Sequence, residues 1–285
     1  MTTLDVPDRY LGLRPVIITS PSTRCGTTMV QRLLTASSNA FIYGEEVGHQ
    51  IRTVTVWLIG MLRVFEQAHP QIDEDFAQAL AGTLATWRPG LTAPVEVMRK
   101  AWIETYYQLP YTLAEFSRSQ GRPVWGFKFP AFSRDTIKAM LALMPETRVV
   151  YVIRNLCDAL KSAKARRFAT SEDEIGQFCA DWASNMREMI DLALDQRVLF
   201  LKYEDLMADR GRCMELLQQF TGAENLDAHA FDLKVNTFEG AEADGHSPTS
   251  YIAPCDLTDG ERAIIMAKAG PVLTHLYPDP FQAAA

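Results

Sequence analysis

Residues 16–34 read VIITSPSTRCGTTMVQRLL, and this stretch decides the fold that we expect for the chain. Val16–Ile18 is a β-branched run typical of a buried parallel strand. The turn Ser20–Thr28 follows, and apolar residues then recur at helical spacing. A strand, a turn of small residues and a helix form the layout of a phosphate-binding loop, because the N–H groups of the turn and the positive end of the helix face an anion together.

The residue types in this turn favour an anion site of an unusual kind. Gly26 allows a close approach of the backbone to a phosphate, Thr27 and Thr28 add hydroxyl donors, and Arg24 adds a fixed positive charge. A Walker A loop, GxxxxGK[ST], would require Gly at position 21 and Lys at position 27. The chain has Pro21 and Thr27 there, which disfavours ordinary NTP binding. The plain alternative is a tight turn without a ligand.

A second pattern of the same kind begins at Arg154, directly after the apolar run 148–153. Ser162 follows eight residues later, about two helical turns on. Arg166 comes four residues after Ser162, so we expect both on one face of a helix. A guanidinium can grip a dianionic phosphate with paired hydrogen bonds, and a hydroxyl can donate another. The plain alternative is an arginine that caps the sheet beside a solvated serine.

The order of elements predicts an α/β fold with a three-layer parallel sheet. Short apolar strands alternate with helical patterns, which favours right-handed crossovers and a ligand site beyond the carboxyl ends of the strands. Arg24, Lys128 and Arg154 each lie at or just after a strand end, so we expect them on one rim. The predicted strands are 16–20, 123–128, 148–153 and 198–202, and the predicted helices are 27–35, 133–144, 156–168, 172–194, 212–220 and about 258–269.

Two regions interrupt this alternation. Residues 47–122 are predicted to be a helical insertion packed over the sheet edge, where it could cover an acceptor site. Residues 232–254 are polar and irregular, which is typical of a binding loop. We expect one domain over 1–285 that contains both.

Bulk properties exclude several classes of protein. The net charge of −7 disfavours a nucleic-acid surface. Five cysteines and five histidines are scattered without metal-ligand spacing, so we expect no metal and a reducing compartment. The N-terminal sequence lacks a signal pattern and no apolar run is long enough for a membrane span, from which we expect a cytoplasmic protein without a transmembrane segment.

Both anion patterns resemble the cofactor motifs of sulfotransferases that use PAPS (3′-phosphoadenosine 5′-phosphosulfate). Thr23-Arg24-Cys25-Gly26-Thr27-Thr28 resembles the 5′-phosphosulfate loop of that family, and Arg154 with Ser162 resembles its 3′-phosphate motif. The resemblance implies a P-loop nucleotide-hydrolase-like sulfotransferase fold and PAPS as the donor. It also implies that these residues bind the cofactor, together with Arg166 and, by a loose match in the late loop, Tyr251.

Two further segments extend this resemblance. Trp125-Gly126-Phe127-Lys128-Phe129-Pro130 is similar to a family strand that ends in Gly-x-Lys-x-Pro, and Lys202-Tyr203-Glu204-Asp205-Leu206 is similar to its Tyr-Glu-Asp-Leu segment. We interpret the second segment as mainly structural, with Glu204 or Asp205 bracing the next helix.

The resemblance also implies catalytic roles. Arg24 would act on the 5′-phosphate and the bridging oxygen, and Lys128 would stabilise the transferring sulfuryl group. Tyr43-Gly44-Glu45-Glu46-Val47 resembles the Gly-Glu-Glu segment of tyrosylprotein sulfotransferases, which indicates Glu46 as the base, whereas carbohydrate sulfotransferases indicate Glu45. Glu46 is preferred, Glu45 is close behind, and His49 is the third choice. A pair of acids at a helix N-terminus is the structural alternative.

The resulting hypothesis is a PAPS-dependent sulfotransferase. It would move a sulfuryl group in line to the hydroxyl of a small molecule, peptide or sugar and release 3′,5′-ADP, and it could form a homodimer. The rivals are a P-loop-like nucleotide kinase or NTPase, and a catalytically inactive nucleotide-binding relative.

Overall fold

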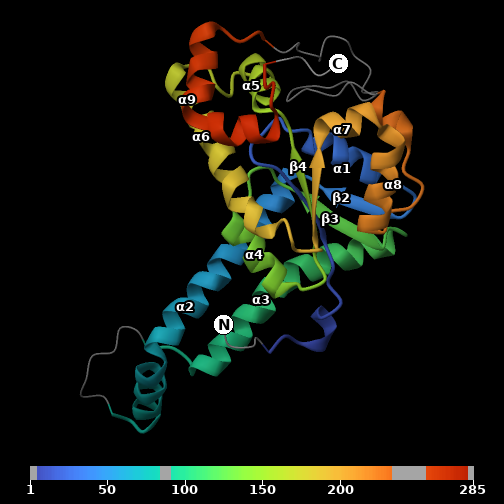
Figure 1. The fold of residues 1–285 in the computed structure, drawn as a ribbon. Helices are drawn as coiled ribbons and strands as arrows, with labels where there is room; N and C mark the ends of the chain where they lie inside the picture. The colour runs from blue at the N-terminus through green and yellow to red at the C-terminus, as the bar shows by residue number, and fades with distance from the viewer. Residues whose placement is uncertain (1–4, 84–90, 233–254, 282–285) are drawn as a thin grey trace.

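Five parallel strands form a single sheet in the computed structural model, which describes residues 5–83, 91–232 and 255–281 (Figure 1). The strand order is β2-β3-β1-β4-β5, so β1, which leads into the phosphate-binding turn, lies in the middle. The strands are β1 Val16–Thr19, β2 Ala40–Tyr43, β3 Val124–Lys128, β4 Arg148–Ile153 and β5 Val198–Lys202.

The four predicted strands are present within one residue of their expected bounds, whereas β2 was missed. This edge strand pairs with β3 alone, with Ala40 opposite Val124 and Tyr43 opposite Phe127. It has only four residues, and Ala40 and Ile42 are buried while Phe41 is exposed. Such a short alternating run is a weak signal beside the longer apolar strands of the sheet centre.

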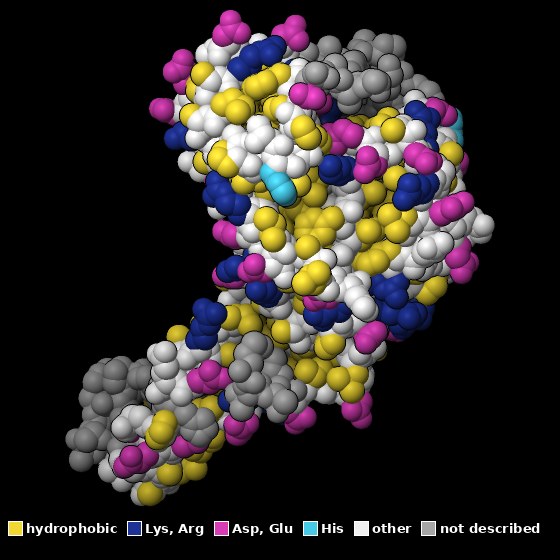
Figure 2. All heavy atoms as spheres, viewed as in Figure 1, with side chains coloured by type: hydrophobic (Ala, Val, Ile, Leu, Met, Phe, Trp, Pro, Cys, Tyr) yellow, Lys and Arg dark blue, Asp and Glu magenta, His cyan; other side chains and the backbone are white. Residues whose placement is uncertain are grey.

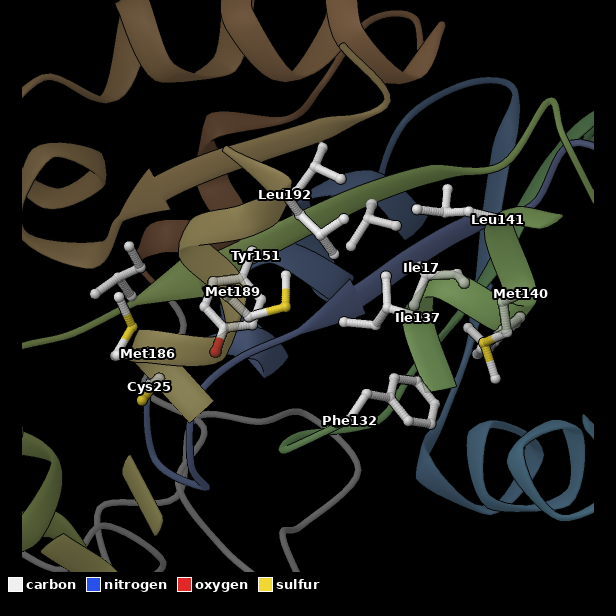
Figure 3. Packing of buried hydrophobic residues seen from close by; sticks show 14 of the residues in the cluster. Ile17, Cys25, Phe132, Ile137, Met140, Leu141, Tyr151, Met186, Met189 and Leu192 are labelled. Carbon is white, nitrogen blue, oxygen red and sulfur yellow. The ribbon is translucent and has the colours of Figure 1, made fainter. Parts of the chain in front are cut away.

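Helices cover both faces of the sheet, which confirms the three-layer α/β class. Because successive strand residues point to opposite faces, Ile17 and Tyr151 belong to one core cluster while Ile18 and Val150 belong to the other. Figure 3 shows the first cluster, with Tyr151 beside Met189 and Ile17 beside Ile137. The helices on the first face are α4 Arg134–Leu143, α6 Glu172–Met189 and α9 Asp259–Leu276; on the second face lie α1 Thr27–Thr35, α8 Arg210–Thr221 and the 3-10 helix Ala228–Phe231.

Several predicted helix ends require correction. The helix expected to run to residue 168 is α5, Leu156–Ala165, and α6 stops at Met189, followed by a 3-10 turn over Ile190–Leu192. The last helix, α9, continues to Leu276 through Pro271. A proline inside a helix costs a hydrogen bond, but Ala269 and Leu273 are fully buried on either side of it, and this packing stabilises the extension.

Two long helices, α2 Glu45–Leu80 and α3 Val95–Ser119, occupy the stretch in which a helical insertion is predicted. Pro70 and Pro110 lie inside them rather than at their ends. Figure 1 shows that α2 and α3 lie side by side and project beyond the sheet, and that α2 changes direction in its last turns. Because α2 begins at Glu45, both Glu45 and Glu46 lie in its first turn.

Charged side chains of both signs intermingle on the face drawn in Figure 2, including the part formed by the projecting helices. Among the described residues, no helix combines the length and the apolar character that a membrane span requires. The short α7, Tyr203–Ala208, follows β5 and completes the rim where the site lies.

Candidate active site

The turn after β1 has an unusual backbone that only its sequence explains. Arg24 and Gly26 both adopt positive φ, 68° and 95°. Gly26 also lies against the ring of Tyr203, since a Cβ at this position would be 2.3 Å from the nearest ring atom. Glycine is therefore required at position 26 for two reasons, conformation and space. The strain at Arg24 is typical of a functional loop, because it persists only where the surroundings enforce it.

The loop is braced from the helix that covers it. Asn185 on α6 donates from Nδ2 to the carbonyl of Pro21 at 2.7 Å. The first N–H groups of α1, those of Thr27 and Thr28, have no acceptor within the helix because the helix begins there. Together with the dipole of α1, these N–H groups favour an anion at this end of the helix.

The side chain of Cys25 points into the core beneath this loop. The Cys25 side chain is fully buried, and its Sγ lies 3.4 Å from the Ser22 Oγ. Burial raises the pKa of the Cys25 thiol, so the group stays protonated and inert. Thr23 accepts a hydrogen bond from the Ser22 hydroxyl through its carbonyl.

The two predicted anion motifs meet. Arg24 donates from Nε to the Oγ of Ser162 at 3.0 Å, and Arg154 donates from Nη1 to the Arg24 carbonyl at 3.0 Å. These bonds join residues 138 and 130 positions apart. The Arg154 guanidinium also lies over the ring of Tyr203, 4.7 Å from its centroid. One side chain, Tyr203, therefore touches both motifs.

Arg166 completes what we call the guanidinium cluster: Arg24, Arg154 and Arg166. Arg166 is the C-cap of α5, which ends at Ala165, so it lies one residue beyond the helix that was expected to contain it. It nevertheless lies near the loop. Burial lowers the pKa of Arg24, and the positive charges of Arg166 and Arg154 lower it further. Like charges held this close favour the binding of an anion between them.

Lys128 lies beside this cluster and already has a carboxylate partner. Its Nζ is 2.6 Å from the Oε1 of Glu45 and 3.0 Å from the Oγ1 of Thr28. The lysine side chain is 6% exposed and the glutamate 49% exposed. Glu45 also raises the pKa of Arg24 by its charge, which places this Lys128–Glu45 pair next to the guanidinium cluster.

Close packing of α2 on the end of β3 creates the Lys128–Glu45 pair. A Cβ on Gly48 would lie 2.7 Å from the Lys128 carbonyl oxygen and 2.7 Å from the Phe129 Cβ. Glycine one turn into α2 thus lets the helix approach the strand end closely. The first turn of α2, with Glu45, is thereby held over Lys128.

The structure separates the three candidate bases. Glu46 is exposed and accepts a hydrogen bond from Gln50 on its own helix at 3.4 Å. His49 is exposed, with its ring 6.0 Å from that of Phe129. Only Glu45 bonds to Lys128, so the geometry favours Glu45 over the preferred Glu46.

Sequence reasoning undervalued the Tyr-Glu-Asp-Leu segment. Tyr203 packs under Arg154 and against Gly26, and Glu204 accepts a hydrogen bond from the backbone N–H of Asn155 at 2.8 Å. Glu204 therefore braces the preceding anion motif, and with Asp205 it also lies in the first turn of α7. The sequence signal that could have indicated this role is the position of Tyr203 and Glu204 directly after the strand that ends at Lys202. Tyr251 and the late loop from 233 onward lie outside the described residues.

Two other features bear on the chemistry. Within the described ranges, no group of His, Cys, Asp or Glu is arranged to hold a metal ion. A hollow of about 370 Å³ lies at the amino ends of β4 and β5. The guanidinium cluster lies at the carboxyl ends of the strands, so the two are remote from each other. The lining residues of the hollow are Pro145, Glu146, Arg148, Gln196, Arg197, Gln219 and Phe220.

Comparison with known proteins identifies the family of this chain. Residues 15–227, about three quarters of the chain, match the family described as "Sulfotransferase family". No curated protein matches.

Distant structural likeness is found to sulfotransferases. One is from Alicyclobacillus acidocaldarius, with 15% identity and a TM-score of 0.48 over 92% of this chain and 95% of that one. Another is the sulfotransferase domain of the Synechococcus olefin synthase, with 13% identity and a TM-score of 0.46 over 93% and 98%. A mouse sulfotransferase whose structure was solved in complex with PAP has 11% identity and a TM-score of 0.45, over 96% of this chain and 88% of that one. At such distances the assignment depends on the family match: this chain belongs to the sulfotransferase family.

Proposed function

We propose that this protein transfers a sulfuryl group from PAPS to an acceptor hydroxyl and releases 3′,5′-ADP. The observation that carries the proposal is the contact between the two anion motifs, with Arg24 bonded to Ser162 and Arg154 bonded to the Arg24 carbonyl. A nucleotide with phosphate groups at both its 5′ and 3′ positions is a ligand that would engage both motifs at once.

The residues present fit this donor. The N–H groups of the Thr23–Thr28 loop and the Arg24 guanidinium would hold the 5′-phosphosulfate, because the loop opens at the positive end of α1. Arg154, Ser162 and Arg166 would hold the 3′-phosphate through charge-assisted hydrogen bonds. Gly26 gives the loop the positive φ of 95° that its shape requires.

PAPS supplies the sulfuryl group, and the chain supplies position and charge. Lys128 lies beside Thr28 at the edge of the loop, where its ammonium would stabilise negative charge on the oxygens of the transferring group. Glu45, half exposed and bonded to Lys128, would accept the proton of the attacking hydroxyl. Arg24 would stabilise charge on the bridging oxygen, as positioned cations do in phosphoryl transfer.

The acceptor that we propose is a hydroxyl on a small molecule, peptide or sugar. It would approach from the side of Glu45, because the carboxylate oxygen that receives the proton must lie within hydrogen-bond reach of that hydroxyl.

Calorimetric titration with 3′,5′-ADP tests the proposal directly. We expect saturable binding without added metal, and weaker binding of 5′-AMP, which lacks the 3′-phosphate. A screen with PAPS labelled in its sulfate, against phenols, sugars and tyrosine peptides, then tests transfer.

The two rival functions predict different results. A kinase or NTPase would bind ATP with magnesium and ignore 3′,5′-ADP, but a loop without lysine at position 27 argues against it. An inactive relative would bind 3′,5′-ADP and transfer sulfate to no acceptor in the screen.

A further inference from the structure

Three segments that are distant in sequence converge next to Arg154. The first is the junction of β4 and α5 at Arg154–Asn155. The second is the junction of β5 and α7 at Tyr203–Glu204, which lies alongside because Ile153 pairs with Lys202. The third is the short segment Tyr277–Pro280 that follows α9. Hydrogen bonds connect all three.

Glu204 is the centre of these hydrogen bonds. One carboxylate oxygen, Oε1, accepts from the backbone N–H of Asn155 at 2.8 Å. The other, Oε2, accepts from the hydroxyl of Tyr277 at 3.0 Å. Burial and the charge of Glu204 raise the pKa of the Tyr277 hydroxyl, so it stays protonated and remains a donor. Glu204 thus holds the residue after Arg154 with one oxygen and is itself held by Tyr277 through the other.

The end of α9 and the segment after it make three more contacts with the same region. The Nδ2 of Asn155, which is 6% exposed, donates to the carbonyl of Pro280 at 2.9 Å. Lys202 donates from Nζ to the carbonyl of Leu276 at 3.2 Å, and its ammonium lies 5.0 Å from the centroid of the Tyr277 ring. The neighbours of Arg154 and Tyr203 in the chain, Asn155 and Lys202, are therefore held by hydrogen bonds to the C-terminal part of the described chain.

We infer that Glu204 and Tyr277 are positioning residues for Arg154, which hold its guanidinium ready for the 3′-phosphate without touching the nucleotide. The inference depends on the proposed function, since it assumes that Arg154 binds the 3′-phosphate. Arg154 is aimed by its bond to the Arg24 carbonyl and by the Tyr203 ring. Both supports shift if the backbone at Asn155 or Glu204 moves, and a group that must be ordered on binding loses affinity.

The test compares two nucleotides on the full-length protein. The ratio of the dissociation constant of 5′-AMP to that of 3′,5′-ADP measures how strongly the protein recognises the 3′-phosphate. We expect Glu204→Ala to lower this ratio about tenfold, because it removes two hydrogen bonds, and Tyr277→Phe about threefold, because it removes one. The affinity for 5′-AMP should change less than about twofold. Glu204→Gln keeps one oxygen that can accept from the Asn155 N–H, and its NH₂ group can donate to the Tyr277 hydroxyl oxygen, so it should stay closer to the wild-type ratio than Glu204→Ala.

Tyr107→Phe is the matched control. It also removes a tyrosine hydroxyl that donates to another part of the chain, the carbonyl of Leu143, but it lies in the core between α3 and α4. We expect it to lower the melting temperature without a change in the ratio. If Tyr277→Phe and Tyr107→Phe have the same effect on the ratio, or if Glu204→Ala weakens both nucleotides equally, the positioning role is overturned.

The wild-type titration separates failure of the inference from failure of the proposed function. A wild-type protein that does not bind 3′,5′-ADP overturns the proposed function and this inference with it. Wild-type binding with an unchanged ratio in Tyr277→Phe, and in Glu204→Ala where it folds, overturns the positioning role alone.

Discussion

The guanidinium cluster and the Lys128–Glu45 pair lie side by side but differ in how their positive charge is surrounded. In the cluster, Arg154 and Arg166 lower the pKa of Arg24, so cations face cations. In the pair, a carboxylate oxygen lies 2.6 Å from the Lys128 ammonium. The cluster therefore favours a ligand that brings negative charge, whereas the pair contains a cation and a base that can serve a reaction.

This difference implies that binding and chemistry are separable. The product nucleotide 3′,5′-ADP carries both phosphates but no sulfuryl group. Its affinity should depend on the guanidinium cluster and hardly at all on the Lys128–Glu45 pair, whereas the rate of transfer should depend on both. The predictions below test that separation, from the largest expected effect to the smallest.

Glu45→Gln should reduce the rate of sulfate transfer about 100-fold or more, because positioned general bases contribute about 10²–10⁴-fold. The rate is measured in single-turnover assays with an acceptor from the screen. The affinity for 3′,5′-ADP should stay within about threefold of wild type.

Glu46→Gln is the control for this change. Glu46 bonds only to Gln50 among the contacts of the described chain that involve its carboxylate, so we expect transfer within about threefold of wild type. A large loss with Glu46→Gln and none with Glu45→Gln would restore Glu46 as the base.

Arg154→Ala should weaken binding of 3′,5′-ADP about 100-fold. A hydrogen bond to a charged group is worth about 1.5–3 kcal/mol, and a guanidinium can make two to a phosphate. Calorimetry measures the change, with Arg118→Ala as the control, because Arg118 pairs with Glu115 at the end of α3. Equal losses in Arg154→Ala and Lys128→Met would mean that the cluster and the pair are one binding unit, which would break the comparison.

The sequence predicted the cluster better than the pair for a physical reason. Arg24 and Arg154 follow strands whose ends share one rim, and parallel-sheet topology brings such ends together. The sequence therefore predicts that Arg24 and Arg154 lie close together.

The Lys128–Glu45 contact depends instead on how α2 packs on β3, at the close approach of Gly48. Tertiary packing of this kind leaves no periodic pattern in the sequence. The same limit explains β2, whose four residues are held by pairing with β3, and the role of Tyr203, which is defined by its contact with Gly26.

Gly26→Ala should weaken 3′,5′-ADP binding about tenfold or more and destabilise the fold. Positive φ costs a non-glycine residue about 1–2 kcal/mol, and the new Cβ would meet the Tyr203 ring at 2.3 Å. Gly60→Ala is the matched control, since Gly60 lies inside α2 with open space around its Cβ position. It should stabilise the protein by about 0.5–1 kcal/mol. Unchanged binding in Gly26→Ala would show that the loop does not need its observed shape.

Asn185→Ala should have the smallest effect, about a fivefold loss of 3′,5′-ADP affinity. It removes the 2.7 Å bond to the Pro21 carbonyl that braces the loop from α6, and a neutral hydrogen bond is worth about 1 kcal/mol. Gln177→Ala, on the same helix, removes a bond only to Asp181 and should leave affinity unchanged. Because Asn185 supports the loop and not the Lys128–Glu45 pair, transfer at saturating PAPS should stay near wild type. A loss of transfer rate without a loss of affinity would instead mean that α6 positions the reacting groups.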